Sequence, residues 1–230
     1  MKEAIRKFRL TSLEPAARAC AELMRDESLF DVAVLGQFKS GKSSLLNALI
    51  GVDLLPVGVV PVTAVVTRLY AGSSLSAQVT RLDGRTEAIP PERIVEFVTE
   101  ALNPANRRRV AVVDVMTPAL SAWPSLRLVD TPGLGSTFEH NTKATKDWLP
   151  NVAGALVVIS ADRPLSDDDR RLIAEVRQLA PRVWVILSKF DLLNADQQAE
   201  LIVFLQGRLR EYFGSDVPLV PFSARRDLAH

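Results

Sequence analysis

Gly36-Gln37-Phe38-Lys39-Ser40-Gly41-Lys42-Ser43 is the stretch that decides the fold, because it places Gly, four residues, Gly, Lys and Ser in the order of a phosphate-binding loop. Such a loop requires a strand before it and a helix after it. The apolar run from Phe30 to Leu35 predicts a buried strand, and the run from Ser44 to Ile50 predicts the opening of a helix. The sequence therefore predicts strand, loop and helix in the order that holds a nucleotide phosphate.

The residue types of this loop suit a polyphosphate. Gly36 and Gly41 allow close approach of the backbone, and the N–H groups of residues 39 to 44 lie at the positive end of the helix dipole. Lys42 would reach the β- and γ-phosphates, and the Ser43 hydroxyl would bind Mg²⁺. The loop residues expected to bind the nucleotide are Gly36, Gln37, Phe38, Lys39, Ser40, Gly41, Lys42, Ser43 and Ser44.

Composition limits the classes of partner. The chain has 28 Lys and Arg against 27 Asp and Glu, so it carries no global charge that would attract nucleic acid, and no nucleic-acid partner is expected. The single Cys20 excludes an internal disulfide framework and agrees with a reducing cytosol. No apolar run is long enough to span a bilayer, and the start of the chain lacks the apolar core of a signal peptide. We expect a cytoplasmic chain.

The first half of the chain predicts a helical segment before the α/β domain, and a hairpin, a helix and further strands within that domain. Residues 1 to 28 carry apolar residues at helical spacing and predict an N-terminal helical segment, whereas residues 29 to 230 predict one α/β domain. Whether the segment packs on that domain or on something absent from the chain stays open. Asp83-Gly84 predicts a hairpin between strands at 76–82 and 85–89. The expected continuation is a helix over 90–102, a solvated loop with Arg107, Arg108 and Arg109, and strands at 110–116 and 126–129.

The second half alternates strands and helices. Strands are expected at 155–160, 183–187 and 217–222, with helices over about 167–179 and 196–213. Ser166 and Asp169 are expected to cap the first of these helices, and Gly214 is expected to end the second. This rhythm predicts an α/β fold with a mostly parallel sheet and helices on both faces.

Three further motifs follow predicted strands, and together they indicate which nucleotide the chain binds. Asp130-Thr131-Pro132-Gly133 suits a carboxylate that holds Mg²⁺ through water and a Gly133 N–H that meets the γ-phosphate. In Ser188-Lys189-Phe190-Asp191, Asp191 can accept two hydrogen bonds from guanine, and the stem of Lys189 can cover the base. Ser223-Ala224 offers a backbone N–H to guanine O6. Four motifs in this order favour GTP over ATP.

Because of these four motifs, residues 30 to 225 resemble the GTPase domain of the dynamin superfamily. The resemblance is closest to the bacterial dynamin-like proteins, which are similar to mitofusins. The resemblance also rests on Leu54-Leu55-Pro56 before Pro61-Val62-Thr63, and on the segment Ser160-Ala161-Asp162-Arg163-Pro164-Leu165-Ser166. It implies the P-loop GTPase fold with the enlarged dynamin-type G domain, and a metal site of Ser43, Thr63 and Asp130. Thr67 is the weaker alternative to Thr63.

The chain departs from the family pattern at several positions. Ser188 stands where Asn or Thr is usual, and its hydroxyl can still brace the phosphate loop. Leu134 and Phe38 occupy positions where related GTPases place a Gln that orients water. Lys39 stands where relatives carry Ser, with a bound monovalent cation, or a catalytic Arg; a monovalent cation is expected here only if Lys39 does not replace it. The residues expected to act in catalysis are Lys39, Lys42, Thr63 and Gly133.

The expected function is binding of GTP with Mg²⁺ and its hydrolysis to GDP and phosphate. The resemblance implies a GTP-dependent homodimer across the nucleotide face, and membrane remodelling or tethering through regions absent from this chain. The alternative is a GTP-gated self-assembly module with negligible hydrolysis, because no orienting Gln is visible.

Overall fold

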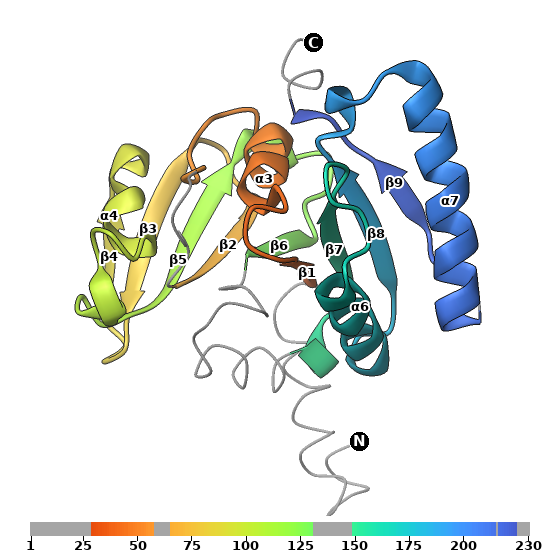
Figure 1. Cartoon of the computed structure of the whole chain (residues 1–230). Helices are drawn as coiled ribbons and strands as arrows, with labels where there is room; N and C mark the ends of the chain where they lie inside the picture. The colour runs from red at the N-terminus through yellow and green to blue at the C-terminus, as the bar shows by residue number, and fades with distance from the viewer. Residues whose placement is uncertain (1–28, 58–64, 131–148, 215, 225–230) are drawn as a thin grey trace, which may run out of the picture.

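The computed structural model describes residues 29–57, 65–130, 149–214 and 216–224, which form one twisted sheet flanked by helices (Figure 1). The described strands number nine and lie in the order β4-β3-β5-β2-β6-β1-β7-β8-β9. The strands are β1 (Phe30–Leu35), β2 (Val66–Ala71), β3 (Ser76–Arg81), β4 (Thr86–Ile89), β5 (Val110–Thr117), β6 (Leu126–Asp130), β7 (Gly154–Ser160), β8 (Val183–Ser188) and β9 (Leu219–Pro221). The α-helices are α3 (Lys42–Ile50), α4 (Val95–Val98), α6 (Asp167–Leu179) and α7 (Ala195–Phe213).

The sheet is mixed, with mostly parallel pairings, as the strand-helix rhythm predicts. Strands β6, β1, β7, β8 and β9 run parallel, and β2 pairs parallel with β5. The antiparallel pairings are those of β2 with β6 and of β3 with β4 and β5. The parallel half carries the phosphate-binding loop, and the hairpin half extends the sheet beyond it.

Two apolar cores lie on opposite faces of the sheet. Alternate residues of β1 belong to different cores: Val34 lies in the core that includes residues of α3 and α4, whereas Ala33 and Leu35 lie in the core that includes residues of α6 and α7. This alternation is the period of two that a strand imposes on its side chains. Helices therefore cover both faces, as predicted.

The long helices begin and end where local sequence signals place them. Ser166 accepts a hydrogen bond from the Asp169 N–H while the Asp169 carboxylate binds the Ser166 N–H, which confirms the predicted capping pair. Asn194 and Gln197 form the same arrangement at the start of α7. Gly214 ends α7 with φ of 64°, a conformation that glycine adopts without steric cost.

The helix predicted over 90–102 is wrong in its extent. A 3₁₀ turn covers Pro91–Arg93, and α4 ends at Val98 because Thr99 is extended, with φ −94° and ψ 141°. The Asn103 amide donates to the Phe97 carbonyl at 2.7 Å and so occupies an acceptor that further helix would have used, and the Thr99 hydroxyl donates to the Val95 carbonyl at 2.8 Å.

Asn47, in the middle of α3, fixes the segment that follows this helix. Its buried amide donates to the Leu55 carbonyl at 2.8 Å, and its oxygen accepts from the Leu54 and Leu55 N–H groups at 3.2 Å and 2.7 Å. The chain is therefore tied back to the helix shortly before residue 58. The predicted N-terminal helix of residues 1–28 with Cys20, and the residues Thr63, Gly133 and Leu134, lie outside the described residues.

Candidate functional site

The loop between β1 and α3 requires glycine at both of its Gly positions. A Cβ atom on Gly36 would collide with the Val158 carbonyl oxygen and lie 2.6 Å from the Ser40 hydroxyl. Gly41 has φ of 96°, and a Cβ atom there would lie 3.0 Å from the Ser188 hydroxyl. The neighbouring strands β7 and β8 therefore press directly on this loop, and only a residue without a side chain fits.

Lys42 opens α3 and turns its side chain back into the loop. Its ammonium donates to the Gly36 carbonyl at 2.7 Å and to the Gln37 carbonyl at 3.1 Å. Burial lowers the pKa of Lys42, and the charge of Asp130 opposes that shift. The cation is held inside a loop of backbone groups, at the start of the helix whose N–H groups favour an anion.

Asp130, the last residue of β6, lies beside β1 in register with Val34. It is buried, and its Oδ1 atom has no hydrogen-bond partner among the described residues. Burial raises the pKa of Asp130 to about 6, and the charge of Lys42 limits that rise. A buried carboxylate without a full set of partners is unfavourable unless a cation joins it.

A magnesium ion fits this position by the chemistry of its donors. Mg²⁺ takes oxygen ligands, and the unpaired Asp130 oxygen, together with the Ser43 hydroxyl at the start of α3, would supply them. Thr67, the weaker candidate, is a fully buried residue of β2 and pairs in register with Asp130; its hydroxyl has no partner among the described residues. Thr63 and Gly133 remain predictions.

The motif predicted to recognise the base comes to the same end of the sheet. Ser188 ends β8, and its hydroxyl donates to the Ser40 carbonyl, in the bracing arrangement predicted for it, with the Ile159 carbonyl 3.0 Å away. Asp191 lies in the 3₁₀ turn that follows, and the Phe190 N–H binds the Phe222 carbonyl at 3.2 Å. This bond holds the turn next to Ser223 and Ala224.

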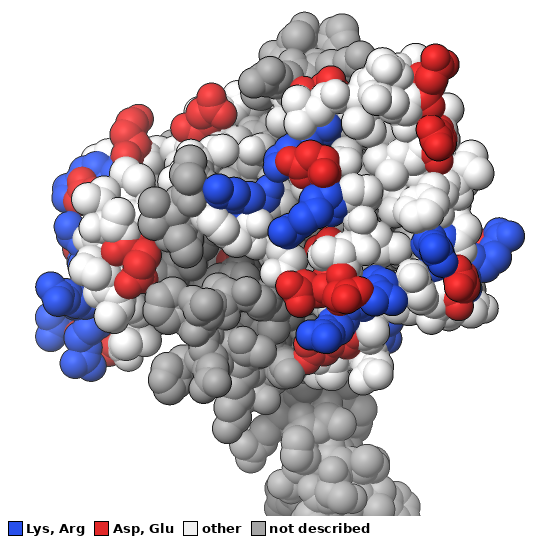
Figure 2. Space-filling view, viewed as in Figure 1, with Lys and Arg blue, Asp and Glu red and all other residues white. Residues whose placement is uncertain are grey.

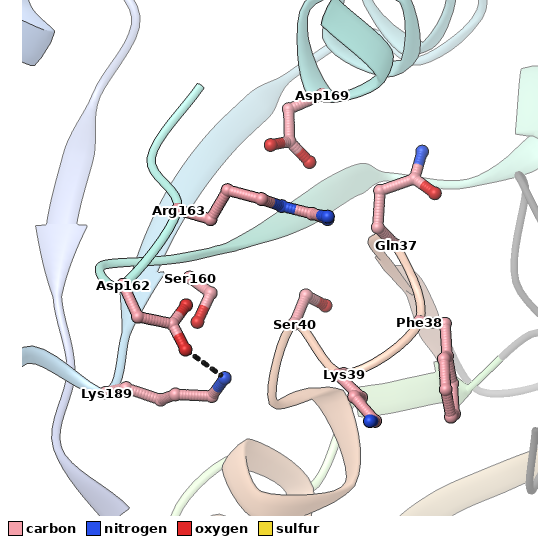
Figure 3. Close-up of a pocket in the computed structure, with 9 residues that line it drawn as sticks. All are labelled: Gln37, Phe38, Lys39, Ser40, Ser160, Asp162, Arg163, Asp169 and Lys189. Carbon is pink, nitrogen blue, oxygen red and sulfur yellow. Dashed lines mark hydrogen bonds and ion pairs between the residues drawn. The ribbon is translucent and has the colours of Figure 1, made fainter. Parts of the chain in front are cut away.

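A cavity of about 380 Å³ separates the phosphate loop from this turn (Figure 3). It is lined by Gln37, Phe38, Lys39, Ser40, Ser160, Asp162, Arg163, Asp169 and Lys189. Figure 3 shows the Arg163 side chain reaching across the cavity toward Gln37, and the Lys189 ammonium meeting Asp162. Of the lining residues, Ser160, Asp162, Arg163 and Asp169 were not among those predicted for the site, although Ser160 ends a predicted strand and Asp162 and Arg163 follow shortly after it.

Lys39 takes a conformation that is uncommon for a residue with a side chain. Its φ is 63°, its side chain is exposed, and its ammonium lies 5.5 Å from the centre of the Phe38 ring. The two side chains lie next to each other at the edge of the cavity (Figure 3). The loop thus places a cation at the mouth of the site without burying it.

Charges of both signs are mixed over the face that holds the cavity (Figure 2). Arginines gather at the far end of the hairpin, where Arg107, Arg108 and Arg109 are exposed, as predicted for a solvated loop. Arg108 lies 3.6 Å from Glu96 and 5.0 Å from the Phe97 ring centre, so one of the three also packs against the protein. No described helix combines the length and apolar character needed to cross a membrane.

Comparison with known proteins gives one consistent family. A family model described as the dynamin family matches residues 32–190. Dynamin-like protein 2 of Campylobacter jejuni is 32% identical over 184 residues, which cover 80% of this chain and 29% of that protein. A probable chloroplastic transmembrane GTPase, FZO-like, of Arabidopsis thaliana is 29% identical over 206 residues, which cover 89% of this chain and 20% of that protein.

Solved structures agree. An oligomerised bacterial dynamin pair, described as a mechanism for the long range sensing and tethering of membranes, matches with a TM-score of 0.66 and 25% identity. That match covers 85% of this chain and 31% of the other. This chain therefore spans less than a third of the length of these similar proteins.

Proposed function

Because the chain belongs to the dynamin family and forms its GTPase domain, we propose that it binds GTP with Mg²⁺ and hydrolyses it by in-line attack of water. The observation that carries the proposal is the buried carboxylate of Asp130, whose Oδ1 atom has no hydrogen-bond partner among the described residues and whose charge acts on Lys42. These are the groups that a magnesium-bound triphosphate needs, and they come from the start of α3, which follows β1, and from the end of the neighbouring strand β6.

Different residues of the chain would bind the phosphates and the magnesium ion. Lys42 would exchange its two carbonyl partners for the β- and γ-phosphates, and the N–H groups of residues 39 to 44 would bind the remaining phosphate oxygens. Ser43 and Asp130, with Thr63, would hold Mg²⁺, which neutralises the phosphate charge when bound. Gly133 would donate its N–H to the γ-phosphate.

Base selection would occur at Lys189, which lines the cavity, and at Asp191 in the turn that follows it. Asp191 would accept the two donors of guanine, Lys189 would cover the ring, and the Ser223-Ala224 backbone would meet O6. The Phe190–Phe222 backbone bond supports this division, because it keeps the two halves of the base site together.

The attacking water has no orienting Gln at the Phe38 position. We propose that Lys39 supplies positive charge to the γ-phosphate as negative charge develops, with Gln37 and backbone carbonyls as the remaining groups that could orient water. Self-association across the nucleotide face, and a role in membrane remodelling through regions outside this chain, follow from the family and belong to the same proposal.

The base site gives the first prediction. Asp191→Asn should weaken GTP binding by about 1–3 kcal/mol and improve binding of xanthosine triphosphate, because the amide mismatches guanine and matches xanthine. Titration of both nucleotides measures it, and unchanged GTP affinity would remove Asp191 from the base site.

Phosphate release from GTP, followed over a range of protein concentrations, tests the reaction itself. Release that the wild-type chain shows and Lys42→Ala lacks supports hydrolysis. Binding and self-association of GTP-loaded protein with no release at any concentration would favour the GTP-gated assembly module instead.

A further inference from the structure

An ion pair crosses one wall of the cavity described above. The Lys189 ammonium lies 2.9 Å from the Asp162 Oδ2 atom, and both residues line the cavity (Figure 3). The other lining carboxylate, Asp169, already accepts hydrogen bonds from the Ser166 N–H and hydroxyl, at 3.0 Å and 2.7 Å. Asp162 is therefore the acidic group of this cavity that meets Lys189.

Strand register brings the two residues together. Strands β7 and β8 pair in parallel with Ser160 opposite Ser188, so Asp162 and Lys189 follow from adjacent strand ends. The Ala161 N–H binds the Ser188 carbonyl at 2.9 Å, and the Arg163 N–H closes a turn on the Ser160 carbonyl at 3.1 Å. These bonds fix the backbone on both sides of the ion pair.

The backbone at Lys189 is itself restricted. Lys189 has φ of 56° and ψ of 29°, a left-handed conformation that a residue with a side chain seldom adopts. Strained positions of this kind persist where the surroundings hold them, and they gather at binding sites. Here the conformation starts the Lys189 side chain along the cavity wall, and Asp162 holds its far end.

The carboxylate is charged at neutral pH. The Ser160 hydroxyl and the Lys189 ammonium together hold the pKa of Asp162 below its usual range. A free lysine side chain has several rotatable bonds and loses that freedom when it covers a ligand. An anchor at the ammonium removes part of this loss before the ligand arrives.

We propose that Asp162 is a positioning residue for base recognition: by holding the Lys189 ammonium, it keeps the lysine stem extended where it covers guanine. This role rests on the proposed function, and it acts on the base rather than on the phosphates. GDP and GTP should therefore depend on Asp162 to the same degree, and tripolyphosphate, which has no base, should not depend on it.

The test is a fluorescence titration of the full chain with N-methylanthraniloyl GDP and GTP, and a competition titration with tripolyphosphate. Asp162→Asn should weaken both nucleotides about two- to fivefold, the range that a partly exposed ion pair supplies. Asp162→Glu should retain most of the affinity. In a Lys189→Ala background, Asp162→Asn should have no further effect, because the group that it positions is gone.

Asp168→Asn is the matched control. It removes the same charge from the neighbouring start of α6, where Asp168 is 68% exposed and lies 3.9 Å from Arg171, and it should leave nucleotide affinity unchanged. The positioning role alone would be overturned if Asp162→Asn bound nucleotide with wild-type affinity. It would also be overturned if Asp162→Asn lowered nucleotide affinity equally in the wild type and in the Lys189→Ala background. A wild-type chain that binds no guanine nucleotide would overturn the proposed function and this role with it.

Discussion

At the residue scale, Asp130 links the site to the stability of the empty protein. Its pKa rises from 3.8 to about 6 on folding, so the folded state binds the proton more tightly than the unfolded chain does. The stability that this proton contributes is complete below pH 3.8 and is lost as the pH rises through 6. By linkage the loss amounts to about 3 kcal/mol.

Asp130→Asn removes this titration. In nucleotide-free and metal-free buffer, the variant should gain stability over the wild type as the pH rises from 4 to 7, and the gap should then stay constant. Urea unfolding across this pH range measures it. Parallel pH profiles for the two proteins would contradict the assignment of the shift to Asp130.

Lys39 is the residue on which the rate should depend. If its ammonium meets the γ-phosphate as charge develops, Lys39→Ala should lower turnover far more than GTP affinity, and the loss should stay below the roughly 10³–10⁵-fold effect of an arginine finger. Turnover of the wild type should also be the same in Na⁺, K⁺ or a bulky cation. A Lys39→Ala variant that turns over like the wild type would show that Lys39 is only an exposed charge.

At the scale of elements, an ion pair joins β2 to β5, in which the Asp114 side chain is buried and the Arg68 side chain is 31% exposed. Arg68 of β2 and Asp114 of β5 pair in register, and the guanidinium binds both carboxylate oxygens at 2.6 Å. Asp114 is buried, so Arg68→Met would leave its charge without a partner and should cost about 3–5 kcal/mol of stability.

Denaturant unfolding of Arg68→Met, Asp114→Asn and the double variant tests this. The double variant should recover much of the loss, because no charge is then left buried. Arg85→Met is the matched control: its pair with Asp83 is largely exposed at 3.4 Å, and its loss should be within about 1 kcal/mol. Equal costs for Arg68→Met and Arg85→Met would rule out the buried pair as a stabilising contact.

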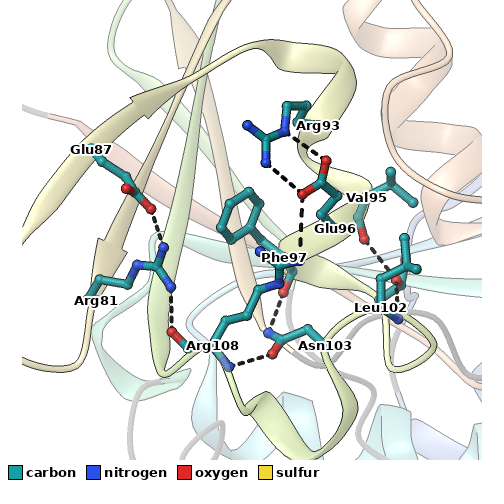
Figure 4. Close-up of polar contacts among 10 residues, drawn as sticks. Arg81, Glu87, Arg93, Val95, Glu96, Phe97, Leu102, Asn103 and Arg108 are labelled. Atoms are coloured by element: carbon teal, nitrogen blue, oxygen red, sulfur yellow. Dashed lines mark hydrogen bonds and ion pairs between the residues drawn. The ribbon is translucent and has the colours of Figure 1, made fainter.

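Helices and strands were predictable from the sequence where residues close together in the chain determine their bounds. The bounds of α6 follow from its capping pair, and the hairpin of β3 and β4 follows from Asp83-Gly84. The helix over 90–102 was overextended because apolar spacing does not reveal that the Asn103 amide turns back onto the Phe97 carbonyl (Figure 4). Leu102, the last residue of the predicted helix, is 51% exposed.

The parts of the candidate site that were predictable are likewise those that short sequence motifs identify. The motifs identify the loop and the strand ends, because each requires particular residues within a few positions. Asp162 was missed because its contact with Lys189, 27 positions further along the chain, depends on the register between β7 and β8, which the sequence does not disclose.

At the scale of the whole molecule, the open question is how many copies complete the site. Lys39 and Phe38 lie exposed at the edge of the cavity, on the face across which self-association is proposed. We expect GDP with aluminium fluoride to produce a dimer that GDP alone does not, and activity per molecule to rise with protein concentration. Light scattering measures the mass, and a monomer in both states would count against a shared site.

The unpaired Asp130 carboxylate also bears on how long the protein lasts in a cell. A domain that is less stable when empty spends more time unfolded, and proteases remove the unfolded form. If guanine nucleotide and magnesium bind the folded form as proposed, their supply would lengthen its lifetime. Cells short of GTP should then contain less of this protein at an unchanged rate of synthesis, and Asp130→Asn, which is more stable when empty, should weaken that dependence.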